Sequence, residues 1–383
     1  MVMHGKLAVI VGGYLGDEGK GKATQTYLHE FRQGIHSNSR SFEKILCIRS
    51  SGGSNTGATV HTGTGKKLGI HMLPAGAFLP QCNSYLGNAV YVNIHILLDE
   101  LKMRSEVLSK EECGRVFISK YAHVVTDDCL QRDAEKEAEQ KLGSTKNGVS
   151  IAASDKYSYR GTTLEQYLKS KPIWAKSLEA YGVEIVDPLY LFQTIVEPAG
   201  WDMVLEGTQG VGLDVNHGFQ YPFVSSGSFS TYGLLDGVGY ALAPSEVCMV
   251  LKAYGSYFGP QRERGHFEDD DFRQFAGEFG TTTKRPRNLC WLDVEQIRKV
   301  ASLVRPTAIM LNCMDKLDWF TEHGKPWSLL IDDGQKIDFD DKPIVNGRLT
   351  TAGTLYVETI EEYAGAPVKF LGVGPQHSDI IER

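Results

Sequence analysis

The chain has 383 residues, of which 42% are hydrophobic and 41 are glycine. This composition is typical of a folded, loop-rich globular protein and excludes a disordered or fibrous chain. The formal net charge of −7 argues against binding of a nucleic-acid polymer, because that function usually needs a broad basic face. The length fits one large α/β domain with excursions, or two domains.

The cysteines indicate a reducing compartment. There are seven, they are scattered along the chain, and none forms a C-x-x-C pair. We therefore expect free thiols, with neither a zinc site nor a disulfide framework. Residues 1–6 lack the apolar core of a signal peptide, and no apolar run reaches the roughly 18 residues of a membrane span. We expect a soluble, cytoplasmic protein that has no membrane partner.

The most informative stretch lies near the N-terminus. Residues 7–11 are an apolar run that predicts a buried strand, residues 12–22 are a glycine-rich turn, and residues 23–31 predict a helix. A strand, a glycine-rich turn and a helix direct several backbone N–H groups at one anion, and Lys20 and Lys22 add positive charge there. Ala23 stands where a P-loop has Ser or Thr for Mg²⁺. Asp17 within this loop indicates metal binding or proton abstraction beside a phosphate.

The next part of the chain alternates strands with polar segments. Residues 45–48 predict a strand, and the small residues 50–59 after it predict a ligand-binding loop. Residues 89–101 predict a strand that leads into a helix. Residues 126–147 are charged and helix-prone, which is mostly the pattern of a solvated helix face, and end in a donor-rich turn that could hold another phosphate. Residues 150–198 predict a helical subdomain, so we expect 126–198 to be a helical excursion from a single domain, 1–383.

Three further strands are predicted to deliver polar groups in the C-terminal half. Residues 203–207 lead to Gln209, residues 247–254 form a core strand, and residues 307–313 lead to Asp318. A carboxylate such as Asp318 can accept from the N1–H and N2–H₂ of guanine, whereas adenine has an acceptor at N1. Between these strands, the threonines and cations of residues 279–287 predict an anion-binding loop.

The last predicted strand, at residues 370–375, could wall a base pocket. Polar groups at several strand ends indicate an α/β sheet with its site along the carboxyl edge of the strands.

These motifs, in this order along nearly the whole chain, resemble the adenylosuccinate synthetase family. The matching segments are Gly16-Asp17-Glu18-Gly19-Lys20-Gly21-Lys22, Gly52-Gly53-x-Asn55-x-Gly57, Gly143-Ser144-Thr145, Glu206-Gly207-x-Gln209-Gly210, Tyr221-Pro222, Glu278-Phe279-Gly280-x-Thr282-Thr283-x-Arg285-x-Arg287, Trp291-Leu292-Asp293, Lys316-Leu317-Asp318 and Gly374-Pro375. The resemblance implies a P-loop NTPase-like fold, with a mostly parallel central sheet flanked by helices, and a homodimer.

The resemblance also implies an activity. Members of this family join L-aspartate to C6 of inosine monophosphate (IMP), using GTP and Mg²⁺. The 6-oxygen is first phosphorylated, and the aspartate amine then displaces the phosphate, because an oxo group leaves poorly until it becomes a phosphate ester.

By resemblance, Asp17 is the base that takes the N1 proton, and Lys20 and Gln209 complete the catalytic set. Asp17 and the carbonyl of Gly57 would bind Mg²⁺. The other implied contacts fall into three groups. The nucleoside triphosphate, which is GTP or ATP, would contact Gly19, Lys20, Gly21, Lys22, Thr59, Lys316, Asp318, Gly374 and Pro375. The purine monophosphate would contact Asn55, Thr145, Arg160, Gln209, Ser225 and Arg285. Aspartate would contact Thr282, Thr283, Arg285 and Arg287.

The sequence departs from the family pattern around the purine nucleotide. The family's catalytic histidine should follow Gly57, but Ala58 stands there, and alanine cannot donate a proton. His61 and His71 are the nearest histidines after it, and the structural role is the favoured interpretation of each. The family arginine contributed across the dimer aligns with Tyr159, next to Arg160, and Asn147 replaces an arginine of the phosphate-loop region.

Three alternatives concern the substrate and the activity. A phage branch of the family uses dGMP to make a precursor of 2-aminoadenine, and its members carry Ser or Gly at the position of Asp17; retention of Asp17 favours IMP, whereas Ala58 favours a divergent paralogue. A nucleotide-binding regulator without catalysis is disfavoured by the retained Lys20 and Arg287. A P-loop GTPase switch is disfavoured by Ala23 and by the lack of Asn-Lys-x-Asp.

Overall fold

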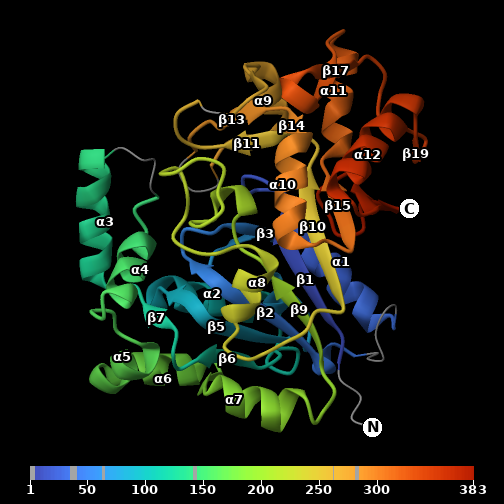
Figure 1. Cartoon of the computed structure of the whole chain (residues 1–383). Coiled ribbons are helices and arrows are strands. Elements are labelled where there is room, and N and C mark those ends of the chain that lie inside the picture. The colour runs from blue at the N-terminus through green and yellow to red at the C-terminus, as the bar shows by residue number, and fades with distance from the viewer. Residues whose placement is uncertain (1–4, 35–40, 63–64, 141–144, 262, 281–283) are drawn as a thin grey trace.

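The apolar runs of the chain pair side by side in an 11-stranded sheet at the centre of the molecule (Figure 1). A computed structural model describes residues 5–34, 41–62, 65–140, 145–261, 263–280 and 284–383. In spatial order, the sheet consists of β21 (Ile380–Glu382), β20 (Val368–Gly372), β15 (Ala308–Asn312), β10 (Glu246–Lys252), β1 (Leu7–Gly12), β9 (Asp202–Glu206), β2 (Ile45–Gly53), β5 (Asn83–Val92), β6 (Val116–Ser119) and β8 (Val183–Val186), with β7 (His123–Val124) beside β5.

Most neighbouring strands of this sheet are parallel, which confirms the predicted fold class. β1 pairs in parallel with both β9 and β10, and β2 with both β9 and β5. The short β21 is antiparallel to β20. Because the carboxyl ends of parallel strands share one edge, the loops that follow β1, β2, β9, β10 and β15 meet there.

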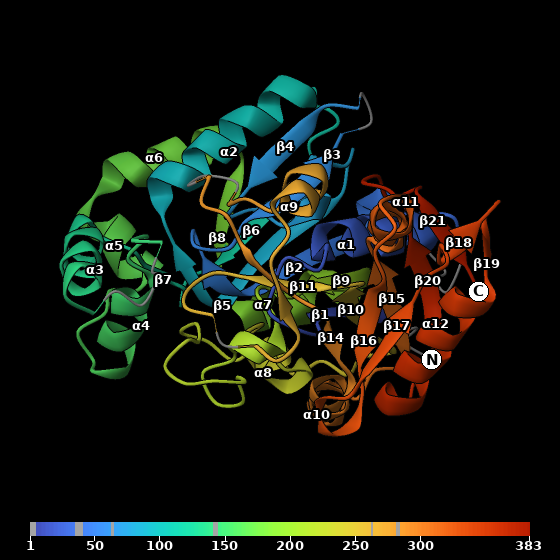
Figure 2. The same cartoon turned by 90° about the horizontal axis from the view of Figure 1, so that it is seen from above.

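Helices cover both faces of the sheet, as Figure 2 shows from above. Ala8 and Ile10 of β1 pack with α1 (Lys20–Arg32) on one face, where Ala23, Tyr27 and Phe31 are buried. Val9 and Val11 point to the other face and share a cluster with α8 (Thr231–Asp236), α10 (Val294–Val304) and α12 (Thr351–Ala364). This alternation explains why β1 reads as one continuous apolar run, since a parallel strand is buried on both sides.

The segment predicted to be a helical excursion is only partly helical. It contains α3 (Asp127–Gln140), α4 (Val149–Tyr157), α5 (Leu164–Ser170), α6 (Pro172–Ala180) and α7 (Pro188–Leu191), which lie beside the β5–β8 half of the sheet (Figure 1). The same segment also supplies β8, which pairs with β6 in the central sheet. A purely helical reading of residues 150–198 was therefore wrong at Val183–Val186.

The remaining described elements sit around the sheet. Helix α2 (Ile94–Val107) begins at Asn93, whose side chain accepts from Ile96 N at 3.2 Å, and packs Leu97 and Leu101 into a second apolar cluster. The small sheets consist of β3 (Ala58–His61) and β4 (Lys67–Ile70); β11 (Gly255–Tyr257), β12 (His266–Phe267) and β13 (Asn288–Cys290); β14 (Leu292–Asp293), β16 (Trp327–Leu330) and β17 (Lys336–Phe339); and β18 (Ile344–Val345) and β19 (Arg348–Leu349). The other helices are α9 (Asp270–Ala276) and α11 (Asp318–Glu322). Within the described ranges, no helix has the length and apolar character to cross a membrane.

Candidate active site

The glycine-rich loop between β1 and α1 is folded around one buried carboxylate. Glu18 accepts hydrogen bonds from Tyr14 N at 3.1 Å and Gly16 N at 2.7 Å, and its other oxygen lies 2.6 Å from Lys20 Nζ. Gly19 has a φ of 89° directly before the helix begins. This left-handed conformation favours glycine and turns the chain sharply into α1, so that the N-terminus of the helix and Lys20 are presented at the sheet edge.

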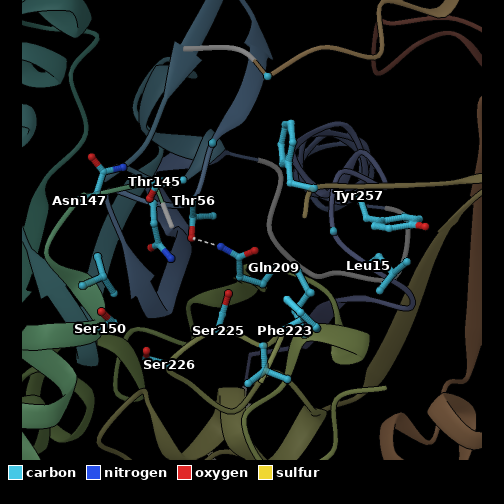
Figure 3. A pocket seen from close by; sticks show the side chains of 18 of the residues that line it. Leu15, Thr56, Thr145, Asn147, Ser150, Gln209, Phe223, Ser225, Ser226 and Tyr257 are labelled. Carbon is cyan, nitrogen blue, oxygen red and sulfur yellow. Dashed lines mark hydrogen bonds between the residues drawn. The ribbon is translucent and has the colours of Figure 1, made fainter. Parts of the chain in front are cut away.

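Two neighbouring loops close against the glycine-rich loop. Gln209 follows β9, and its amide nitrogen donates to Thr56 Oγ1 at 3.2 Å, which links it to the segment after β2. Figure 3 shows Gln209 directed toward Thr56, with Ser225 and Ser226 on one side of the cavity and Thr145 on the other. The residues that sequence analysis took from separate motifs are therefore neighbours in space.

These loops enclose a cavity of about 980 Å³. A volume of this order accommodates more than one small ligand. Many of the residues predicted to be functional line it: Asp17, Lys20, Asn55, Gly57, Thr145, Gln209, Ser225 and Arg287. Others that sequence reasoning did not single out also line it, among them Asp133, Ser150, Phe223, Ser256 and Phe258.

A largely buried network of charges reaches the cavity through Asp17 and Arg287. Lys252 Nζ lies 2.6 Å from Glu278 Oε1 and 3.5 Å from Asp17 Oδ2. Arg287 forms ion pairs with Asp17 and with Glu278 Oε2, the latter at 3.2 Å. Tyr254 donates its hydroxyl to Glu278 at 2.7 Å. The carboxylates and cations alternate, so each charge that leaves water has an opposite partner.

The pKa shifts of Glu278 and Lys252 favour their charged forms. Burial raises the pKa of Glu278, but Lys252 and Arg287 outweigh that effect and lower it to about 2. Burial likewise lowers the pKa of Lys252, and the negative charges of Glu278 and Asp17 more than offset this and leave it raised. Asp17 lies beside the two cations Arg287 and Lys252 and lines the cavity.

Lys252 and Tyr254 are functional candidates that the sequence did not reveal. Both lie at the end of the apolar strand β10, which was interpreted as a core strand only. A lysine as the last residue of such a strand is a usable signal, because a strand end at the carboxyl edge places its side chain at the site.

Apart from Lys20, the residues predicted to bind the nucleoside triphosphate lie outside the cavity lining. Lys22 Nζ donates to the carbonyls of Gly374 and Asp379, both at 2.8 Å, so it holds the loop after β20. Gly19, Gly21, Thr59 and Pro375 also lie outside the cavity lining. Direct phosphate contacts of these residues stay predictions. The structure also gives Lys22 a structural role, because it links α1 to the loop after β20, which was predicted to wall the base pocket.

The predicted guanine-reading carboxylate has a free acceptor. Asp318 begins α11, and its Oδ1 is buried with no hydrogen-bond partner among the described residues. Its Oδ2 lies 3.6 Å from Lys342 Nζ. Burial raises the pKa of Asp318. A buried acceptor without a donor is costly, and a ligand N–H would satisfy it. Lys316 lies over the ring of Phe275 at 4.8 Å.

Only some of the residues predicted to bind the purine nucleotide and aspartate line the cavity. Arg160 does not line the cavity; it pairs with Asp155 at 3.2 Å and its side chain is 65% exposed. Arg285 is exposed and lies at 5.8 Å from the ring of Phe258. Gly280 N donates to the Arg285 carbonyl at 2.8 Å, which fixes the backbone of Arg285 next to Gly280. Thr282 and Thr283 lie outside the described residues.

The small residues of 50–59 are less of a loop than predicted. β2 continues through Gly53, and β3 starts at Ala58, so only residues 54–57 form the turn between them. The prediction was wrong because Ser51, Gly52 and Gly53 pair in parallel with Ala89, Val90 and Tyr91 of β5. Small residues are needed there for another reason: a Cβ on Gly53 would lie 2.8 Å from the Tyr91 carbonyl oxygen.

Comparisons with known proteins point to the family that the sequence motifs resemble. A family model described as adenylosuccinate synthetase matches residues 9–185 and 174–323. The adenylosuccinate synthetase of Wolinella succinogenes is 30% identical, in an alignment that covers 99% of this chain and 100% of the relative. That of Thermotoga maritima is 29% identical and covers 98% of this chain and 99% of the relative.

Two solved structures share the fold. One is fully ligated adenylosuccinate synthetase from Plasmodium falciparum, with a TM-score of 0.81, 23% identity, and coverage of 99% of this chain and 100% of that one. The other is the succinoaminodeoxyadenylate synthetase of cyanophage S-2L, bound to dGMP and dATP, with a TM-score of 0.71, 19% identity, and coverage of 99% and 95%. The family match and the full-length relatives lead to one conclusion: this chain belongs to the adenylosuccinate synthetase family.

Proposed function

We propose that this chain is a ligase that joins L-aspartate to C6 of a 6-oxopurine nucleotide, IMP, with hydrolysis of GTP and with Mg²⁺ as cofactor. The observation that carries the proposal is one cavity of about 980 Å³, which gathers Asp17 and Lys20 of the glycine-rich loop, Gln209 and Arg287 from three separate segments. A carboxylate beside a phosphate loop and an arginine next to it suit a reaction that moves a phosphoryl group and binds a dicarboxylate.

The chemistry assigns one task to each of these side chains. Asp17 takes the N1 proton of the purine, so that the 6-oxygen becomes nucleophilic. That oxygen attacks the γ-phosphorus of GTP, its bond to phosphorus forms, and GDP leaves. The aspartate nitrogen then attacks C6, the C6–O bond breaks, and phosphate departs. Lys20 stabilises the phosphoryl group in transfer, and Gln209 holds the edge of the base.

The residues around the phosphate loop suit Mg²⁺. The Asp17 side chain is 46% exposed and lines the cavity, and Gly57 lines it as well. A carboxylate oxygen and a backbone carbonyl, completed by phosphate oxygens and water, are the ligands that Mg²⁺ prefers. When bound, the ion would neutralise charge on the transferring phosphate. Arg287 and Lys252 both pair with Oδ2 of the Asp17 carboxylate.

The residue that bears on the choice of substrate is Asp17. Retention of this carboxylate favours a purine without a 2-amino group, because the dGMP-using branch carries Ser or Gly at this position. IMP is therefore the proposed substrate, (d)GMP the alternative, and a regulator without catalysis the remaining outcome. We also propose a cytoplasmic homodimer, in which each chain is a single domain with residues 126–198 as its excursion.

The aspartate clamp gives a first prediction. We expect Arg287→Lys to raise the KM for aspartate about tenfold and to leave the KM for GTP unchanged, because lysine keeps the charge that faces Glu278 but loses the fork that binds a carboxylate at two points. Steady-state kinetics with each substrate varied in turn measure this. Arg298→Lys, at an exposed position outside the cavity, is the matched control, and equal effects on both KM values would contradict the clamp.

The unpaired oxygen of Asp318 gives a second prediction. Asp318→Asn should reduce the preference for GTP over ATP by about tenfold or more, because an amide cannot accept from both N1–H and N2–H₂ of guanine. The ratio of kcat/KM for the two nucleotides is the measurement, and the exposed Asp341→Asn is the control. An unchanged ratio would show that the base is recognised elsewhere.

Phosphate release tests the proposed function itself. The assay pairs IMP, dIMP, GMP or dGMP with GTP or ATP, with and without aspartate. We expect aspartate-dependent release with IMP and GTP. Release only with a guanylate would assign the chain to the 2-aminoadenine branch, and no release with any pair would overturn the proposal in favour of the regulator.

A further inference from the structure

The position of the missing family histidine does not face the cavity. Ala58 is the first residue of β3, packs against the second apolar cluster, and is outside the cavity lining. A Cβ built on Gly21 of α1 would lie 3.7 Å from the Ala58 Cβ. The methyl group therefore fills space beside α1, and the cavity lacks an imidazole from this residue.

A different histidine lines the cavity. His71 shares the lining with Asp17, Lys20, Gly57 and Gln209. Its ring lies next to the turn after β2, because a Cβ on Gly57 would lie 3.9 Å from His71 Cε1. Its Nδ1 is buried and has no hydrogen-bond partner among the described residues. A buried ring nitrogen without a partner, at the wall of a ligand cavity, is a group that a ligand can satisfy.

Buried charges fix the backbone of this histidine. The carboxylate of Glu100 accepts the backbone N–H groups of His71, Met72 and Leu73, the last at 2.8 Å. Arg49 donates to the His71 carbonyl and is itself paired with Glu206 at 2.7 Å. Such a shell holds the backbone that carries the ring in one place, which favours a defined position for a group that acts on a reacting atom.

The electrostatic surroundings favour a neutral ring. Burial lowers the pKa of His71, and the neighbouring charge of Arg49 lowers it further. A neutral imidazole still has one N–H donor, so it can stabilise a developing negative charge without being protonated.

We infer that His71 donates a hydrogen bond to the phosphoryl oxygen at C6, and so supplies the contact that the family obtains from the residue at the position of Ala58. The inference rests on the proposed function and adds a catalytic residue to it. During phosphoryl transfer, negative charge gathers on the 6-oxygen and the transferring group, and an N–H already aimed at that charge lowers the barrier. The ring keeps its proton throughout.

His61 is the rival histidine, and the structure separates the two. It lies on β3 outside the cavity lining, and its carbonyl accepts from the Gln25 amide at 3.1 Å. Its side chain is thus not part of the wall that Asp17 and Lys20 share. His61→Ala therefore serves as the control for His71→Ala.

The test compares His71→Ala, His71→Asn and His61→Ala by steady-state kinetics with IMP, aspartate and GTP. We expect His71→Ala to lower kcat about 100-fold or more, with each KM changed less than about threefold, because the contact forms in the transition state. Asparagine also carries an N–H donor, so His71→Asn should recover at least about tenfold of that loss. His61→Ala should match the unmodified chain.

Three results would overturn the inference. One is a kcat of His71→Ala within about threefold of the unmodified chain; another is an asparagine variant no better than alanine at equal thermal stability, which indicates a structural role. The third is a large kcat loss in His61→Ala alone. An unmodified chain that is inactive with every nucleotide pair would instead refute the proposed function, and the inference with it, so the two failures are distinguishable.

Discussion

Asp17→Asn abolishes measurable turnover, with an expected fall in kcat of about 1000-fold or more, while the fold stays intact. Asparagine cannot take the N1 proton, and its amide is a weaker ligand for Mg²⁺ than a carboxylate. The side chain is 46% exposed at the cavity wall, so its loss leaves no large void. Aspartate-dependent phosphate release measures the effect, and thermal unfolding checks the fold.

A matched control for this variant is Asp340→Asn, which makes the same change at an exposed position outside the cavity. We expect it to behave as the unmodified chain. If the turnover of Asp17→Asn stays within about tenfold of that of the unmodified chain, Asp17 is not the base. General-base catalysis contributes about 100- to 10,000-fold, so its loss would lower turnover further than that.

Glu278→Gln lowers the free energy of unfolding by about 3 kcal/mol, because it leaves the buried Lys252 with one carboxylate neighbour in place of two. Among the described residues, Lys252 would keep Asp17, at 3.5 Å, and Ser256, at 2.8 Å, as polar partners. Urea unfolding at neutral pH measures the change. Glu184→Gln, which breaks an exposed ion pair with Arg115, is the control and should have little effect.

The same carboxylate gives a pH dependence of definite sign. Its pKa is lowered in the folded chain from 4.5 to about 2, so the unfolded chain binds the proton at higher pH than the folded chain does. The stability from Glu278 is therefore fully present above about pH 4.5 and is lost as the pH falls toward 2. Glu278→Gln should lack this component of acid destabilisation. Identical acid profiles for the two proteins would contradict the assignment.

The sequence predicted the elements whose signal is local. The apolar runs at residues 7–11, 203–207 and 307–313 became neighbouring or nearby strands of the sheet, since a strand buried on both faces needs apolar residues at every position. The glycine-rich loop was predictable as well, because its left-handed residues and its lysines lie within one short segment.

Features assembled from distant segments were not predictable. The charge network joins Asp17, Lys252 and the segment that carries Glu278 and Arg287, which are three distant parts of the chain, and no local pattern shows that these three meet. β8 was missed because a four-residue strand between helices has a weak periodic signal. His71 could be named from the sequence, but its place in the cavity depends on how β3 and β4 fold over the turn after β2.

The central claim is that the purine 6-oxygen leaves as part of phosphate, and an isotope measurement tests it most directly. The chain is incubated with [6-¹⁸O]IMP, GTP, Mg²⁺ and aspartate, and the released phosphate is examined by mass spectrometry. We predict one ¹⁸O atom in each phosphate formed, matched by one adduct of aspartate and purine. Phosphate that carries no label would contradict the account, because GTP would then be hydrolysed without passing its phosphoryl group through the purine.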